Sequence, residues 1–148
     1  MTYDLLVVLA VLGAVLGAYV GNRLLFRWFG QRAAIAVVPW WEEACKLVAI
    51  VAVPGALAPV LPVHLLFGMA EFGYDWWRNR QDGFFLGLVT FVGHGLVGGL
   101  AALIAARQGS LWGPYVVAGL AHSLYNLAVL TLILPTLGAG AYAGAEKR

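Results

Sequence analysis

The sequence predicts an all-α fold, a polytopic transmembrane helix bundle with about five spans, and two observations support this prediction. Hydrophobic residues make up 62% of the 148 residues and charged residues 11%, whereas soluble domains average about 45–50% and about 25%. A membrane-spanning helix needs about 20 apolar residues, so five spans use about 100 residues and leave short loops. This composition excludes an ordinary soluble enzyme, a disordered chain and a nucleic-acid binder, which needs a basic surface.

The first expected span covers about residues 5–27 and carries Gly13, Gly17 and Gly21 at four-residue spacing. Glycines at this spacing lie on one face of a helix and allow a neighbouring backbone to approach closely. We therefore expect this face to pack against another helix, either within the chain or in a homodimer.

The second expected span covers about residues 33–53 and contains Pro39. Proline is tolerated in the first turn of a helix but kinks a helix interior, so the helix begins either at Pro39 or near Ala33. We favour the longer, kinked helix. With a rise of about 1.5 Å per residue, it places Glu42 as deep in the membrane as the polar groups of the later spans.

Three further spans are expected at about residues 61–77, 84–106 and 113–134, joined by short connections. We expect residues 1–148 to form a single transmembrane domain, with a motif-bearing core at about residues 33–135.

The cations outside the spans indicate the orientation of the bundle. If the N-terminus lies outside, Arg107 alone falls on the outer side, and the others fall on the cytoplasmic side: Arg23, Arg27, Arg32, Arg78, Arg80, Lys147 and Arg148. Cytoplasmic loops of membrane proteins carry an excess of Lys and Arg. The sequence therefore predicts an integral, multi-pass membrane protein with its N-terminus outside and its C-terminus inside.

Polar side chains interrupt four of the expected spans, where ionisable groups are costly and indicate a functional site. They are Glu42, Glu43 and Lys46 in the second span, Glu71 and Asp75 in the third, His94 in the fourth, and His122 and Asn126 in the fifth. Within each span their spacing places them on one helix face. We expect these faces to meet near the middle of the membrane.

These residue types together favour hydrolysis of an amide bond. A buried carboxylate with a histidine can deprotonate a water molecule and so make a nucleophile. A second histidine and an asparagine amide can donate hydrogen bonds to the oxyanion of a tetrahedral intermediate. The set therefore predicts a peptide-bond hydrolase without a covalent nucleophile.

The same residues resemble the motifs of PrsW-type membrane proteases. Residues 42–46 (EEACK) match the EExxK motif, and residues 67–73 (FGMAEFG) resemble the second motif of that family. His94 and the HxxxN pair of His122 and Asn126 follow in the order of the wider superfamily, which includes CAAX prenyl proteases and bacteriocin-processing enzymes (CPBP).

The resemblance covers about residues 39–131, and Thr90 stands where the CAAX branch usually has phenylalanine, which favours the PrsW-like branch. It implies a glutamate-dependent endopeptidase of a prokaryotic cell (inner) membrane that cleaves a transmembrane or lipid-anchored protein without a cofactor. In this assignment Glu42 and His94 activate water, His122 and Asn126 bind the oxyanion, and Glu43, Lys46 and Glu71 support the site.

Other interpretations stay open. Glu43, His94 and His122 are an alternative set of zinc ligands, although no HExxH motif occurs in the chain. Glu42, Glu43 and Glu71 could instead relay protons in a small proton-coupled transporter. A third interpretation is a non-catalytic scaffold that binds transmembrane partners through its glycine-rich helix faces.

The sequence also suggests structural roles for several polar residues. His64, near the outer end of the third span, is expected to be structural. Asp75 is expected to pair with Arg78 or Arg80 at the membrane surface. Cys45 lies in an apolar stretch and is expected to be an inert buried thiol.

Overall fold

The structure is a computed structural model that describes residues 2–55, 57–78, 82–133 and 135. Every regular element of this part of the chain is helical, so the prediction of an all-α fold is confirmed. The elements are α1 (Tyr3–Phe29), η1 (Gly30–Arg32), α2 (Ala33–Ala36), α3 (Val38–Ala52), α4 (Val60–Arg78), α5 (Gly83–Gln108), α6 (Trp112–Ala128) and the π-helical turn η2 (Val129–Ile133).

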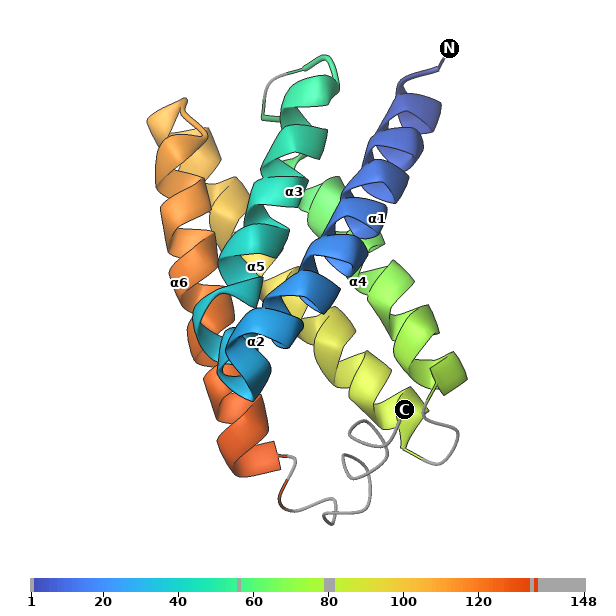
Figure 1. Cartoon of the computed structure of the whole chain (residues 1–148). Helices are drawn as coiled ribbons and strands as arrows, with labels where there is room; N and C mark the ends of the chain where they lie inside the picture. The colour runs from blue at the N-terminus through green and yellow to red at the C-terminus, as the bar shows by residue number, and fades with distance from the viewer. Residues whose placement is uncertain (1, 56, 79–81, 134, 136–148) are drawn as a thin grey trace.

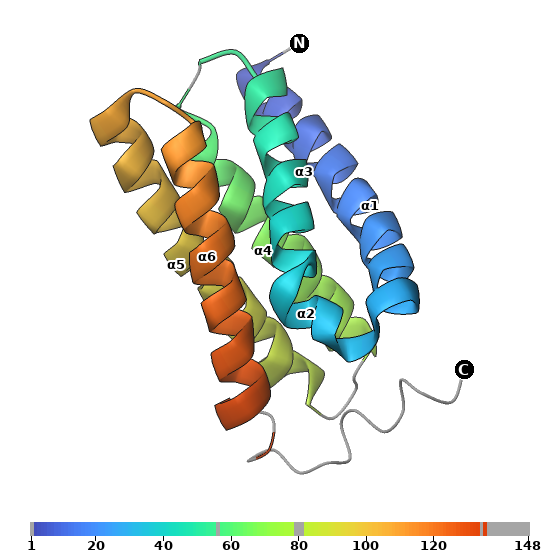
Figure 2. The same ribbon diagram turned by 60° about the vertical axis from the view of Figure 1, so that its left-hand side comes forward.

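The long helices form one bundle in which α1, α4 and α6 run in one direction and α3 and α5 run in the other (Figures 1 and 2). Helix α3 lies between α1 and α6 in both views. Four arginines, Arg23, Arg27, Arg32 and Arg78, lie near one end of these helices, which we call the arginine end. The chain begins at the opposite end of the bundle.

Three helical segments are long and apolar enough to cross a membrane: Tyr3–Phe29, Gly83–Gln108 and Trp112–Ile133. Helix α3 has only 15 residues and, at about 1.5 Å per residue, is shorter than the hydrocarbon core of a bilayer. Helix α4 carries Glu71, Asp75 and Arg78 within its 19 residues. Arg80, Lys147 and Arg148, which contribute to the predicted charge asymmetry, lie outside the described residues.

The second predicted span is interrupted rather than smoothly kinked. A helical turn begins at Ala33, as the longer alternative requires, but it ends at Ala36, and Val37 leaves the helical conformation with φ −123° and ψ −42°. Pro39 then occupies the first turn of α3, as the shorter alternative requires. The residue before a proline disfavours the α conformation, and the break falls close to this position. Glu42 therefore lies in the first half of α3, with α2 between it and the arginine end.

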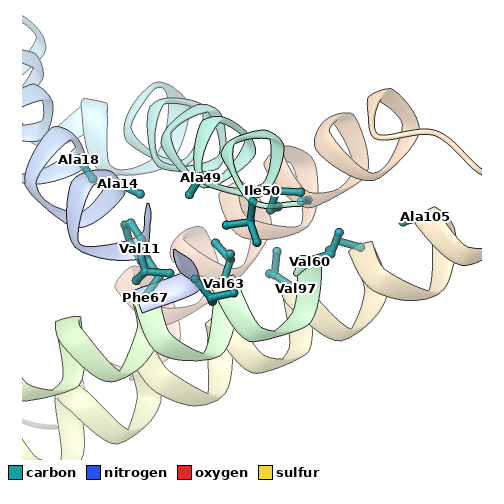
Figure 3. Close-up of a cluster of buried hydrophobic side chains, with 14 residues drawn as sticks. Val11, Ala14, Ala18, Ala49, Ile50, Val60, Val63, Phe67, Val97 and Ala105 are labelled. Atoms are coloured by element: carbon teal, nitrogen blue, oxygen red, sulfur yellow. The ribbon is translucent and has the colours of Figure 1, made fainter. Parts of the chain in front are cut away.

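The apolar core lies toward the end of the bundle opposite the arginines, and Figure 3 shows its side chains between the helices. Its buried members include Val7, Val11, Ala14 and Ala18 from α1, Ala49 and Ile50 from α3, Val60, Val63 and Phe67 from α4, and Val97, Ala101 and Ala105 from α5. These residues come from the beginning of α1 and α4 and from the end of α3 and α5. Close packing of this end leaves the space for a polar site toward the arginine end.

The glycine face of α1 packs mainly against α3 of the same chain. A Cβ atom on Gly17 would contact Cys45 Sγ at 3.5 Å, and one on Gly21 would overlap the indole ring of Trp41. The Trp41 indole also donates a hydrogen bond to the Gly17 carbonyl at 3.2 Å. A Cβ atom on Gly13, in contrast, would meet no atom within 4 Å among the described residues.

Candidate active site

The polar residues predicted from the sequence converge on the centre of the bundle. Five of these residues are buried among the helices: Glu42, Glu43 and Lys46 from α3, His94 from α5 and His122 from α6. Glu71 of α4 lies beside them, and its side chain is 26% exposed. Such groups are stable away from water only when they are paired with one another.

Both carboxylate oxygens of Glu43 lie within hydrogen-bond distance of buried side-chain nitrogens. Its Oε1 lies 2.6 Å from Lys46 Nζ and 3.0 Å from His122 Nδ1, and its Oε2 lies 2.9 Å from His64 Nε2. His64 Nδ1 in turn donates to the Val60 carbonyl at 2.8 Å. Glu43 is thus held from three sides and fixes the orientation of the His122 ring.

Lys46 is completely buried and joins Glu43 to His94. Its Nζ lies 3.0 Å from His94 Nδ1 and 4.5 Å from the centre of the Phe67 ring. An ammonium group can only donate, so His94 Nδ1 accepts and His94 Nε2 carries the proton. That Nε2–H donates to Glu71 Oε2 at 2.5 Å. Both nitrogens of His94 are therefore engaged.

Glu42 points away from Lys46 and toward α1 and α6. Its Oε1 accepts a hydrogen bond from Asn22 Nδ2 at 2.6 Å, and its Oε2 lies 3.6 Å from His122 Nε2. His122 thus stands between the two glutamates, with Nδ1 toward Glu43 and Nε2 toward Glu42.

Glu42, His94 and His122 surround one small volume. One ligand atom from each of these three buried residues lies within 4.8 Å of those of the other two. A water molecule that makes two hydrogen bonds of about 2.8 Å spans such a separation. Glu42 and His94, which the sequence pairs as the water-activating residues, therefore do not touch but lie within reach of a single bridging water.

A cavity of about 290 Å³ leads to this point from the arginine end. Its polar walls are formed by Asn22, Glu42, Glu71, Tyr74, Asp75, Thr90, His94, His122, Tyr125 and Asn126, and its apolar walls by Phe26, Val38, Val89, Gly93 and others. Every long helix contributes to this lining. The space is large enough for several water molecules or for a short extended peptide segment.

Asn126 lines the cavity one turn beyond His122 and also braces the interrupted segment. Its Nδ2 donates to the Ala34 carbonyl in α2 at 3.0 Å. This contact uses one of the two amide N–H groups of the side chain. No hydrogen bond between Asn126 and His122 occurs among the described residues.

The structure changes the set of residues suited to a metal. Glu43, proposed from the sequence as a zinc ligand, is occupied by Lys46, His64 and His122, whereas Glu42 lies with His94 and His122 at metal-ligand separations. Coordination through His94 requires that it release either Lys46 or Glu71. The donor types suit zinc, but the existing hydrogen bonds compete with it.

Sequence reasoning missed the contributions of two residues. Asn22 was not among the candidate site residues, although its side chain donates a hydrogen bond to Glu42. His64 was expected to be structural, although it bonds Glu43 directly. The sequence feature that is connected with His64 is Gly98. A Cβ atom at this position would overlap the His64 side chain, so the glycine leaves room for the histidine between α4 and α5.

The predicted surface pairing of Asp75 with Arg78 does not occur. Asp75 Oδ2 instead accepts a hydrogen bond from Thr90 at 3.2 Å, and Arg78 donates to the Tyr74 hydroxyl at 2.5 Å. Arg80, the other expected partner, lies outside the described residues. Asp75 consequently faces the cavity rather than the surface.

Comparison of the chain with protein-family models, with curated proteins and with solved structures gives no match. The geometry of the site and the motifs of the sequence are therefore the features that bear on the function of the chain.

Proposed function

We propose that this chain is an intramembrane endopeptidase that uses water activated by Glu42 and a histidine to cleave a membrane-embedded or membrane-anchored protein. In this proposal α1, α2 together with α3, α4, α5 and α6 form five spans that cross the bilayer of a prokaryotic cell, with the arginine end in the cytoplasm and the site near mid-depth. Large apolar side chains that face outward support a lipid environment, including Leu16, Val48, Leu96 and Leu124, each 64–70% exposed.

The observation that carries the proposal is the arrangement of Glu42 and His122 at the inner end of the cavity. Their nearest oxygen and nitrogen lie 3.6 Å apart, and Glu43 holds the far side of the His122 ring at 3.0 Å. A carboxylate behind a histidine fixes the ring and supports a positive charge on it, as in other hydrolytic sites. The geometry therefore favours His122, rather than His94, as the immediate partner of Glu42.

In the proposed reaction a water molecule lies between the Glu42 carboxylate and His122 Nε2. Glu42 takes one proton from this water, whose other O–H donates to His122 Nε2, as the water oxygen attacks the peptide carbonyl carbon and the carbonyl oxygen becomes an oxyanion. The second amide N–H of Asn126 stabilises this oxyanion. Collapse of the intermediate breaks the C–N bond, and the abstracted proton passes to the leaving amine nitrogen.

His94, Glu71 and Lys46 serve this reaction as a second hydrogen-bonded layer. Lys46 balances the charge of Glu43. The hydrogen bond from His94 holds the Glu71 carboxylate in place in the wall of the cavity. Buried polar groups that are fully paired rigidify a site. No resident metal or cofactor is part of this proposal.

A proton-coupled transporter is the second candidate, and one observation favours it. A cavity of about 20 Å³ on the other side of the network is lined by Glu43, Lys46 and His64, and this volume is enough for about one water. The contacts from His64 through Glu43 and His122 to Glu42 therefore connect two cavities. Such a chain is also suited to proton transfer.

The test compares Glu42→Gln with Asp4→Asn, which removes an exposed carboxylate outside the site. Each purified variant is reconstituted in liposomes with a labelled single-span model substrate, and products are identified by mass spectrometry. We expect the wild-type protein and Asp4→Asn to cleave, and Glu42→Gln to lose at least about 100-fold in kcat. Cleavage should persist in a zinc chelator.

Each alternative predicts a different result in the same liposomes. Proton flux that depends on Glu42, without any cleaved product, would overturn the protease and establish the transporter. Cleavage that the chelator abolishes and zinc restores would show that Glu42, His94 and His122 act through a metal. Cleavage by Glu42→Gln at the wild-type rate would exclude the proposed base.

A further inference from the structure

Asp75 is a carboxylate of the cavity wall that the proposed reaction does not use. It lies on α4, one helical turn from Glu71 toward the arginine end, and it is partly buried. The Thr90 hydroxyl on α5 donates to Oδ2 at 3.2 Å. This hydrogen bond fixes the rotamer of the aspartate across the α4–α5 boundary.

The groups around Asp75 offset its charge only in part, because Arg78 acts on it from beyond ion-pair distance. No described Lys or Arg side chain lies within ion-pair distance of it. Arg78 on the same helix turns to the Tyr74 hydroxyl, and Thr90 on α5 is neutral. The other carboxylates that line the cavity, Glu42 and Glu71, bear the same sign. This part of the cavity therefore favours a positive charge.

We infer that Asp75, oriented by Thr90, selects substrates that carry a lysine or arginine on the cytoplasmic side of the cleaved bond. This inference rests on the proposed peptidase activity and names its substrate class. A carboxylate in a partly desolvated pocket binds an ammonium or guanidinium group more strongly than one at an open surface.

The spacing of the site suits this assignment. Residues four apart on a helix are separated by about 6 Å along its axis, which an extended peptide covers in about two residues. Asp75 thus lies about two extended residues beyond Glu71 on the wall of the cavity that Glu42 and His122 also line, so a substrate cleaved at Glu42 and His122 can bring a residue a few positions away to Asp75. Transmembrane substrates carry Lys and Arg at their cytoplasmic ends, so their basic residues lie on the same side of the cleaved bond as Asp75 in the proposed orientation.

The experiment is a charge exchange between enzyme and substrate. Single-span substrates differ only in having Lys, Leu or Glu two residues to the cytoplasmic side of the mapped cleavage site. We expect the wild-type protein in liposomes to favour the Lys substrate over the Glu substrate by about tenfold in kcat/KM. Asp75→Asn should remove this preference, and Asp75→Lys should reverse it in favour of the Glu substrate.

Two further variants complete the test. Thr90→Val keeps the side-chain shape but removes the hydroxyl, and it should weaken the Lys preference even if Asp75→Lys fails to fold. Asp82→Asn removes a carboxylate that does not line the cavity, and it should keep the preference. Equal cleavage of the Lys and Glu substrates by the wild-type protein, or a preference unchanged in Asp75→Asn, overturns this inference alone. Absence of cleavage of every substrate overturns the proposed function as well.

Discussion

Glu43 and Lys46 form an ion pair that is buried on all sides, and its surroundings explain how the bundle tolerates it. The side chains are 2% and 0% exposed, and their charged atoms lie 2.6 Å apart. Desolvating two charges costs several kcal/mol for each ion, and only good geometry and additional hydrogen bonds offset that cost. His64 and His122 on one side and His94 on the other supply these bonds. The pair is therefore part of a larger network rather than an isolated structural contact.

In the proposed reaction, this network makes His64 a positioning residue that acts through Glu43. We expect His64→Leu to lower kcat by about 10-fold to 100-fold with little change in KM, because Glu43 loses a partner and His122 loses its fixed orientation. His64→Gln, which retains an N–H donor, should recover part of the rate. The measurement is steady-state cleavage of the model substrate in liposomes.

A double variant separates this role from a general structural one. If His64 acts only through Glu43, then His64→Leu combined with Glu43→Gln should cleave no more slowly than Glu43→Gln alone. Fully additive losses, or an equal loss in His64→Leu and His64→Gln, would contradict the positioning role.

Helix α5 brings α4 and α6 close to the site through its glycines. A Cβ atom on Gly98 would overlap the His64 side chain, and one on Gly93 would collide with the Tyr125 ring. The Tyr125 hydroxyl donates to the Val89 carbonyl at 2.6 Å and so joins α6 to α5. The spacing of the packed helices thus depends on particular glycines.

Gly98 and its neighbour Gly99 provide a matched pair of substitutions. Gly98→Ala should destabilise the protein by about 1–3 kcal/mol, because the new methyl group overlaps buried atoms of His64. Gly99→Ala meets no atom within 4 Å among the described residues, and it should be neutral or stabilising by up to about 1 kcal/mol. Thermal unfolding in detergent measures both effects. A lower melting temperature for Gly99→Ala than for Gly98→Ala would contradict this packing argument.

At the level of elements, the sequence predicted the helices better than their interruptions. Runs of apolar residues indicate helices directly, and the predicted spans at about 84–106 and 113–134 closely match α5 and α6 with η2. The break at Val37 was not predicted, because Pro39 is compatible with both a kink and a helix start. The contact between Asn126 and the Ala34 carbonyl helps to hold this break, and it joins residues 92 positions apart.

Only part of the candidate site could be predicted from the sequence, because the pattern of residues shows contacts within a helix but not contacts between helices. Spacing along a helix places Lys46 within reach of both Glu42 and Glu43 but does not show that it pairs with Glu43. It cannot show which face of one helix meets another, so the contacts of Asn22 with Glu42 and of His64 with Glu43 required the structure.

The whole molecule divides into a closed end and an open end. Small and β-branched side chains fill the end at which α1 begins (Figure 3), and the cavity occupies the arginine end. The cavity therefore gives water a route to Glu42 from the arginine end, while the apolar core fills the opposite end. In the proposed orientation the open side is the cytoplasm, which is where a substrate presents its basic flanking residues.

Cysteine labelling tests this topology, and one position distinguishes five spans from three. In a Cys45→Ala background, single cysteines replace Arg32, Ala58 or Gln108, which are all exposed at helix ends. If α3 and α4 cross the bilayer, a membrane-impermeant thiol reagent applied to intact cells should label positions 58 and 108, and position 32 only after permeabilisation. If only α1, α5 and α6 cross, position 58 should label together with position 32. Labelling of position 32 in intact cells, with position 108 protected, would reverse the orientation and place the cavity on the outer face.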